Sequence, residues 1–255
     1  MELTDRQAEI LSYLKQHNDV QIDELSVMFS VTTQTIRRDV NVLCEQGLAR
    51  RVHGGLSLPA NLTNTTYQFR REVESDIKAA IARQVAQQIP EGSTIIMGIG
   101  TSVTYVAEFL INVKALRVIT NNLQVARIFE KNPNVEVYLC GGLMRCEHQD
   151  VVGHSVLKFF GDFEADIGIV GCGSITPDFF AMEHEPQEAD ITKAILANSR
   201  QSWLLADASK WGRFASVKVA DLTSFSRIYT NKVGLPAELS VYSVHANDYE
   251  REVNI

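Results

Sequence analysis

Two adjacent arginines, Arg37 and Arg38, stand in the stretch VTTQTIRRDV, residues 31–40, whose apolar spacing is that of a helix. The polar side of this helix carries Gln34, Arg37, Arg38 and Asn41, and the apolar side carries Ile36, Val40 and Leu43. Guanidinium groups bind phosphates and guanine edges, and amides bind adenine edges. These side chains predict a DNA-contacting helix; the alternative is a three-helix interaction module with a solvated basic face.

The charge balance of the chain is consistent with one local surface for a polyanion. The formal net charge of the 255 residues is −7. Residues 31–60 hold four arginines against one aspartate and one glutamate, a balance of +2, so the other 225 residues carry −9. Such an asymmetry indicates one basic module on an otherwise acidic protein.

A second set of polar residues follows short apolar segments in the later part of the chain. Segments of this kind at 94–100, 116–122, 135–142, 166–174, 203–207 and 226–231 alternate with helical ones. The alternation predicts a mostly parallel sheet covered by helices, in which ligands bind beyond the carboxyl ends of the strands. The residues at those ends are Gly100, Thr101, Ser102, Thr120, Asn121, Gly141, Gly142, Asp207 and Lys210. Glycine amides, hydroxyls and a lysine suit a polar, phosphorylated ligand.

No cofactor or metal is expected, and no membrane partner. The chain has neither a GxGxxG motif nor a Walker lysine. Its cysteines, which are Cys44, Cys140, Cys146 and Cys172, form no CxxC pair, so reduced, buried thiols are the simplest interpretation. No apolar run approaches the roughly 20 residues that a membrane helix needs, and the N-terminal MELTDRQ does not resemble a signal peptide, which indicates a cytoplasmic protein.

Three helices must position the paired arginines. Thr4 and Gln7 predict a capping box for a first helix that ends near His17. Asp23 is the expected N-cap of the second helix. Ile22 and Val27 are expected to form a hydrophobic staple at its start. Its expected buried side chains are Leu25, Met28 and Phe29.

The third helix and the hairpin after it complete this module. Thr32 or Thr33 caps the helix, which runs to Gln46 with Gly47 at its end. The following GLARRVHGG, residues 47–55, predicts a basic hairpin. In this hairpin Leu48 and Val52 are expected to face inward, and Arg50 is expected to face outward between them. The order of elements predicts a winged helix-turn-helix, mainly helical, joined to the larger α/β domain.

Between the two modules, residues 58–72 read as a linker with Pro59 and a run of Asn and Thr. From Arg70 the chain is again helical until Pro90, with an apolar side formed by Ile77, Ile81, Val85 and Ile89. The predicted division is a DNA-binding domain at 1–57, a linker and connecting segment at 58–72, and an effector-binding domain at 73–255.

The segment TTQTIRRDVNVLCEQGLARRVHGG closely resembles the signature of the DeoR family of bacterial transcriptional regulators. The resemblance is dense over about residues 20 to 55 and thinner along the rest of the chain. It implies DNA-facing roles for Gln34, Thr35, Arg37 and Arg38 on the helix, and for Arg50, Arg51 and His53 on the wing. Thr33 and Thr35 suit a helix start and a phosphate contact equally well.

The family's large domain resembles ribose-5-phosphate isomerase, and this implies an effector pocket. The implied contacts are Gly100, Thr101, Ser102, Thr120, Asn121, Gly141, Gly142, Arg145, Glu188, Asp207 and Lys210. The chain departs from many members at Gly98, where they carry aspartate, and at Thr192-Lys193, where they carry Lys-Arg. The segment 182–185 is either a specificity-setting loop or a solvated acidic turn.

The resulting prediction is a sequence-specific DNA-binding repressor of a carbohydrate catabolic operon, released by a phosphorylated sugar or a related metabolite. Subunits are expected to form a dimer or tetramer on double-stranded DNA, because one module offers few contacts. The alternative is a sugar-phosphate isomerase-like enzyme with an accessory DNA-binding module, in which Asp207, Glu188 and Lys210 supply the acid, base and cation. The DNA-binding regulator is preferred, and no residue is expected to be catalytic.

Overall fold

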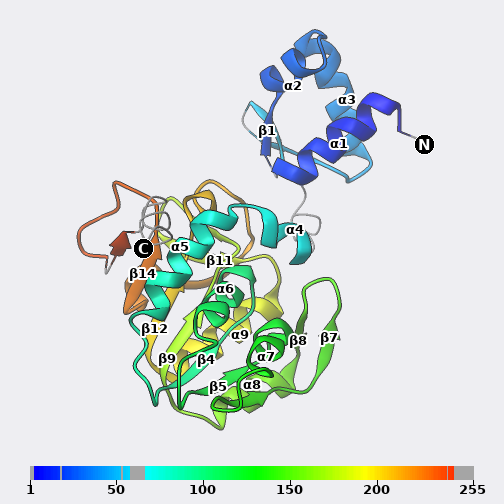
Figure 1. The fold of residues 1–255 in the computed structure, drawn as a ribbon. Coiled ribbons are helices and arrows are strands. Elements are labelled where there is room, and N and C mark those ends of the chain that lie inside the picture. Colours follow the sequence, from blue (N-terminus) through cyan, green and yellow to red (C-terminus); the bar gives the residue numbers. More distant parts are fainter. Residues whose placement is uncertain (1–2, 18, 53, 58–66, 240, 244–255) are drawn as a thin grey trace, which may run out of the picture. The chain divides into compact units, whose positions relative to one another are not determined.

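The computed structural model describes residues 3–17, 19–52, 54–57, 67–239 and 241–243, and divides the chain into two compact units, 1–65 and 66–255 (Figure 1). In the first unit the elements are α1 (Asp5–His17), β1 (Asp19–Gln21), α2 (Ile22–Met28), α3 (Thr33–Glu45), β2 (Arg50–Val52) and β3 (Gly55–Ser57). The three strands form an antiparallel sheet in the order β1-β3-β2. This unit is a winged helix-turn-helix, as predicted.

Local sequence signals set the ends of α1 and α3. The Thr4 hydroxyl accepts from the Gln7 amide at 3.3 Å, and the Gln7 side chain accepts from the Thr4 amide at 3.1 Å, which confirms the capping box. Thr32 is the N-cap of α3, and Gly47 follows the helix with a φ of 71° that suits glycine.

The prediction for α2 was wrong at its start and on its surface. Its N-cap is Gln21, not Asp23, because residues 19–21 pair with β3 and the helix begins directly after that strand. Asp23 instead lies in the first turn, where the helix dipole interacts favourably with a carboxylate. Leu25 is buried, but Val27 is 80% exposed and Met28 45% exposed, so the predicted staple and part of the predicted buried stripe are absent.

The second unit is built on a seven-stranded sheet in the order β15-β14-β12-β9-β4-β5-β6, and all six neighbouring pairs are parallel. The strands are β4 (Thr94–Met97), β5 (Arg117–Thr120), β6 (Glu136–Leu139), β9 (Ala165–Val170), β12 (Ser199–Leu205), β14 (Arg227–Thr230) and β15 (Val241–Ser243). A strand lies in each of the six predicted segments. The predicted α/β domain with a mostly parallel sheet is confirmed.

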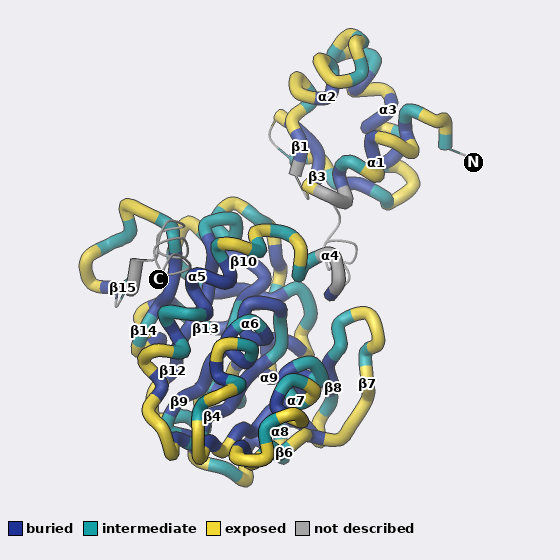
Figure 2. Tube along the Cα trace, in the orientation of Figure 1, coloured by how far each residue is buried: buried dark blue, intermediate teal, exposed yellow. Residues whose placement is uncertain are grey.

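Helices cover both faces of this sheet. The covering helices are α5 (Ser75–Ala86), α6 (Thr101–Phe109), α7 (Leu123–Phe129), α8 (His154–Gly161) and α9 (Pro186–Ala197), and the short α4 (Tyr67–Glu72) lies against α6. Residues of α5, α6 and α7 share one apolar cluster, and those of α8 and α9 share another. Ile95 and Met97 of β4 belong to the first cluster and Ile96 to the second, so the sheet is buried on both faces (Figure 2).

Short elements complete the second unit. A hairpin joins β7 (Leu143–Arg145) to β8 (Asp150–Val152), and a small antiparallel sheet joins β10 (Ser174–Ile175), β11 (Phe180–Glu183) and β13 (Val217–Asp221). Two 3-10 helices are η1 (Ala208–Lys210) and η2 (Leu222–Ser224). The helix predicted from Arg70 to Pro90 is two helices, because Glu74 takes a φ of 55° between α4 and α5.

Candidate functional site

The outward side of α3 is polar and open. Gln34, Arg37, Arg38 and Asn41 are exposed, whereas Ile36, Val40 and Leu43 on the opposite side are 0% exposed. Among the described residues, neither Arg37 nor Arg38 forms an ion pair with a carboxylate. The one acidic residue in the middle of the helix, Asp39, is buried and holds Arg6 at 2.7 Å and Gln7 at 3.0 Å. The paired guanidinium groups are therefore available to an external anion.

Thr32, and not Thr33, is the residue that caps the start of α3. Thr32 supplies the cap: its hydroxyl accepts from the Thr35 amide at 3.2 Å and lies 3.0 Å from the Thr35 hydroxyl. Thr33 is the first residue of the helix and has no capping role. The helix start is thus accounted for by Thr32.

On the wing, Arg51 is the exposed arginine of β2. Its guanidinium donates to the Asn41 side chain and so links the wing to the polar side of α3. The prediction that Arg50 faces outward was wrong: Arg50 is half-buried and its Nε atom is fully buried. Alternate residues of a strand share a side, so Arg50 lies with Val52 and not with Arg51. His53 lies outside the described residues.

The predicted ligand site lies at a reversal of strand order. From β4 the chain runs to β5 and β6 on one side, then returns to β9 and continues to β12 and β14 on the other. In parallel sheets, ligands bind at the carboxyl ends of the strands where the order reverses. The loop after β4 contains Gly100, whose φ of 107° suits glycine, and leads into the buried Thr101 and Ser102 at the start of α6.

Thr120, at the end of β5, and the two asparagines after it are buried and mostly hydrogen-bonded. Thr120 donates to the Met97 carbonyl at 2.7 Å, and the Asn121 amide nitrogen donates to the Val151 carbonyl at 2.8 Å. The Asn121 Oδ1 atom is buried and accepts no hydrogen bond from the described residues. An unsatisfied buried acceptor is costly, so this atom favours a ligand donor such as a hydroxyl.

The two glycines after β6 differ. A Cβ atom on Gly142 would lie 2.6 Å from the Ser155 hydroxyl and 3.0 Å from the Val152 carbonyl, so packing requires glycine there. A Cβ atom on Gly141 would meet nothing within 4 Å. The Gly141 carbonyl accepts from Ser155 at 3.0 Å, and both glycines are exposed.

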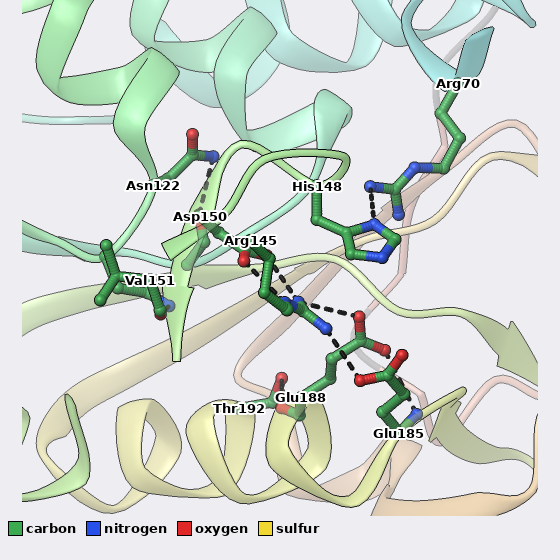
Figure 3. A network of polar contacts seen from close by, with 11 residues as sticks. Arg70, Asn122, Arg145, His148, Asp150, Val151, Glu185, Glu188 and Thr192 are labelled. Carbon is green, nitrogen blue, oxygen red and sulfur yellow. Dashed lines mark hydrogen bonds and ion pairs between the residues drawn. The ribbon is translucent and has the colours of Figure 1, made fainter. Parts of the chain in front are cut away.

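Arg145 is the centre of an ion-pair network (Figure 3). It contacts Asp150 at 2.6 Å, Glu185 at 3.0 Å and Glu188 at 3.1 Å. Burial lowers the pKa of the guanidinium, but Asp150 and the two glutamates outweigh burial and hold the pKa above its ordinary value. Two predicted ligand contacts, Arg145 and Glu188, therefore bind each other and tie the β7–β8 hairpin to α9.

Cations gather near the end of β12. Asp207 is buried, accepts from the Ser209 amide at 3.0 Å and lies beside the half-buried Lys210. Lys78 on α5 is also buried; its burial, and then the neighbouring Lys210, lower the pKa of the Lys78 ammonium to about 7. Arg70 and Arg213 lie close enough to act on the same groups. Such a set of cations favours an anionic ligand.

The sequence prediction missed Arg70, Lys78 and Arg213. One signal was available: Lys78 lies three residues before Ile81 and seven before Val85, on the apolar side of its helix. A lysine at a buried helical position is rare unless it is paired, and it often marks a functional site.

The segment 182–185 is not a solvated turn. Met182 and Glu183 end the strand β11 and are buried. Burial, and then the nearby Glu188, raise the pKa of Glu183 to about 8, whereas burial lowers the pKa of His184 to about 4. The solvated acidic turn is thus excluded, and the segment lies against the same charged cluster.

The chain departs from the family pattern at Gly98 and at Thr192-Lys193, and each position has its own packing or hydrogen bonds. A Cβ atom on Gly98 would lie 3.0 Å from Ile195 Cδ1 and 3.4 Å from the Ile169 carbonyl. Thr192 is buried and donates to the Glu188 carbonyl at 3.0 Å, whereas Lys193 is exposed. The strand end after β4 is therefore filled by an isoleucine from α9.

A surface pocket of about 660 Å³ lies beside α4. It is lined by Tyr67, Arg71, Gln124, Arg127, Cys146, Glu147 and Gln149. None of the predicted contact residues lines it. The described residues contain no helix able to cross a membrane, and they contain no cluster of His, Cys, Asp or Glu that could hold a metal ion.

Both units match models of known protein families. A model of the DeoR-like helix-turn-helix domain matches residues 6–61, and a model of the DeoR C terminal sensor domain matches residues 73–232. The chain is 38% identical over 244 residues to the glycerol-3-phosphate regulon repressor of Escherichia coli (strain K12), covering 96% of each chain. It is 37% identical over 228 residues to the HTH-type transcriptional repressor CsqR of the same organism, covering 89% of this chain and 87% of the relative.

A more distant relative is the HTH-type transcriptional repressor GlcR of Bacillus subtilis (strain 168), which is 29% identical over 230 residues, 90% of this chain and 88% of the relative. Among solved structures, ribose 5 phosphate isomerase A from Neisseria gonorrhoeae matches 53% of each chain with 14% identity and a TM-score of 0.39.

Proposed function

The chain belongs to the DeoR family of transcriptional regulators, and from that premise we propose that it represses a carbohydrate catabolic operon and is released by a phosphorylated sugar or a related metabolite. The relatives at 37% and 38% identity are both named repressors, and one of them takes its name from the glycerol-3-phosphate regulon. A small phosphorylated polyol or sugar is accordingly the effector class that we propose.

The DNA-binding half of the proposal depends on α3. Its exposed arginines stand on a helix whose other side is fully buried, which supports insertion into the major groove. The proposed DNA contacts are Thr33, Gln34, Thr35, Arg37 and Arg38 on the helix, and Arg51 and His53 on the wing; the half-buried Arg50 is not among them. Of these, Arg37 and Arg38 carry the most weight, because no described carboxylate competes for them.

The effector half of the proposal depends on the strand-end residues. Amides and hydroxyls at Gly100, Thr101 and Ser102 suit the phosphate, and Lys210 supplies a cation. The buried Asn121 Oδ1 suits a hydroxyl group of the ligand. The remaining proposed contacts are Thr120, Gly141, Gly142, Arg145, Glu188 and Asp207.

The proposed assembly has a DNA-binding domain at 1–57, a connecting segment at 58–72 and an effector domain at 73–255. We expect two or four copies on one operator, because paired half-sites raise affinity above that of a single small module. We also expect the effector site to bind sugar phosphates without converting them, as the named repressors favour a regulator over an isomerase.

One experiment tests the DNA-binding half. The full chain is titrated with duplex DNA from upstream of its own gene at several salt concentrations. Arg37→Ala should weaken operator binding and lower the salt slope by about one unit, because a phosphate contact releases about one counterion. The matched control is Arg117→Ala, which removes an exposed arginine from the other unit and should leave the slope unchanged.

The effector half is tested by thermal shift against phosphorylated sugars and polyols, with glycerol 3-phosphate included. A ligand that binds only the native state raises the melting temperature. Turnover of any of these compounds by the purified chain would favour the isomerase instead. An Arg37→Ala variant with wild-type affinity and salt slope would refute the proposed DNA-binding helix.

A further inference from the structure

The C-terminal end of α4 is capped by side chains from other helices. The last carbonyl groups of a helix have no partner within it and need outside donors. The donors here are the Lys78 ammonium to the Arg70 and Val73 carbonyls, the Thr101 hydroxyl to the Arg70 carbonyl at 3.4 Å, and the Tyr105 hydroxyl to the Arg71 carbonyl at 3.2 Å. The helix end is thus held by α5 and α6.

Other polar contacts hold the rest of α4. The Tyr67 amide donates to the Glu147 carbonyl at 2.8 Å, and the Arg71 guanidinium lies 2.6 Å from Glu108. The Arg70 guanidinium lies 3.4 Å from the His148 ring (Figure 3). A helix of six residues is too short to be stable alone, so its order depends on these contacts.

One capping donor, Thr101, is a proposed effector contact, and a second, Lys78, lies close to that site. Thr101 begins α6 directly after the β4 strand end, and Lys78 is near enough to Lys210 and Asp207 for their charges to act on it. A phosphate oxygen is a stronger acceptor than a peptide carbonyl, because its hydrogen bonds are charge-assisted. A phosphate bound there would compete with α4 for the Thr101 hydroxyl and the Lys78 ammonium.

We infer that α4 is the element that couples the effector site to the DNA-binding unit: a bound phosphate takes the Thr101 and Lys78 donors from the end of α4 and loosens the helix. This inference rests on the proposed function, because it takes the effector to be a phosphorylated anion. Along the chain, α4 is the first helix after the DNA-binding unit, and residues 58–66 join the two.

Loosening α4 changes the tether of the DNA-binding unit. Six helical residues span about 9 Å, whereas the same residues extended reach about 20 Å. A longer and freer tether lowers the effective concentration of the second module at its half-site once the first is bound. Operator affinity falls without any change in the α3 surface itself.

The test uses Tyr105→Phe in the full chain, which removes one cap of α4 that lies outside the proposed effector contacts. Its operator affinity without ligand should fall about two- to tenfold. Its affinity for glycerol 3-phosphate should rise, because the substitution favours the loosened α4 that the ligand is proposed to favour. The matched control is Tyr138→Phe, whose hydroxyl contacts the exposed Glu136 on the sheet edge and whose loss should change neither affinity.

Hydrogen exchange of the amides in 67–72 gives a second readout. Saturating glycerol 3-phosphate should speed their exchange in the wild-type chain. The inference is overturned if Tyr105→Phe leaves both affinities unchanged or weakens both. It is also overturned if a wild type that binds both operator and glycerol 3-phosphate shows equal protection of 67–72 with and without the ligand. A wild type that binds neither operator nor any phosphate ester refutes the proposed function as well.

Discussion

Lys78 brings an unusual protonation state to the proposed effector site. Burial, and then Lys210, lower its pKa to about 7, so near neutral pH the ammonium and the free amine are both populated. Asp207 acts in the opposite direction, while Arg213 and Arg70 reinforce the lowering. An arriving anion would favour the ammonium, so binding should take up a proton.

The pH dependence of effector affinity follows from this state. Between pH 7 and pH 9 a phosphate monoester stays dianionic, because its second pKa is about 6. Affinity for glycerol 3-phosphate should therefore fall as pH rises above 7, by up to about tenfold per unit for one proton. Calorimetric titration at pH 7, 8 and 9 measures the slope.

The control for this prediction is Lys78→Arg, which keeps the charge but does not titrate in that range. Glu183, with a pKa raised to about 8, gains charge over the same interval and acts in the same direction. The slope should therefore shrink in Lys78→Arg without vanishing. Equal slopes for the two proteins would mean that Lys78 is not the group involved.

Residues within one helix could be predicted from the sequence, whereas clusters assembled from distant segments could not. The exposure of Arg37 and Arg38 follows from a period of 3.6 residues, which neighbours along the chain determine. Lys78, Glu183 and Lys210 come from different elements and meet only after the sheet has formed. The sequence showed the residues at the strand ends but not the cations that other helices bring to them.

At the scale of elements, the strands of the repeating βα pattern and the basic hairpin of β2 and β3 were predicted, whereas short strands that pair with distant segments were not. β1 has three residues and pairs with β3, more than thirty positions along the chain, so no local signal marks it. Because residues 19–21 pair with β3, α2 begins at Ile22 and not after Asp23 as predicted. The pairing of β11 with β13, in which Phe180 lies opposite Asp221, was missed for the same reason.

The contact between β4 and α9 leads to a test of the Gly98 departure. Gly98→Asp would place a Cβ atom 3.0 Å from Ile195 Cδ1, and such overpacking costs about 1–3 kcal/mol. Ile195→Val removes that carbon atom at a cost of about 0.5–1.5 kcal/mol on its own. The double variant should lose less free energy of unfolding than the two single variants lose together. Urea unfolding of the wild type and the three variants measures these free energies. Strict additivity would mean that Ile195 does not restrict residue 98.

At the scale of the whole molecule, the proposed DNA contacts and the proposed effector contacts lie in different compact units. Lys210→Ala should keep operator affinity within about twofold of wild type, since sites that share no partners behave independently. The same variant should need a higher glycerol 3-phosphate concentration to leave the operator, because it lacks a cation of the phosphate site. Gel-shift titrations with and without the ligand measure both quantities. Loss of operator binding in the absence of ligand would contradict this separation.

The aromatic residues of the chain are unevenly placed, and this has a practical consequence. Its two tryptophans, Trp203 and Trp211, both lie in the second unit. Trp203 packs against Tyr229 within the sheet, and Trp211 directly follows Lys210 at the proposed phosphate site. Tryptophan fluorescence, excited selectively over tyrosine, therefore reports on the second unit alone, and Trp211 should give an unlabelled optical signal when a ligand reaches the proposed site.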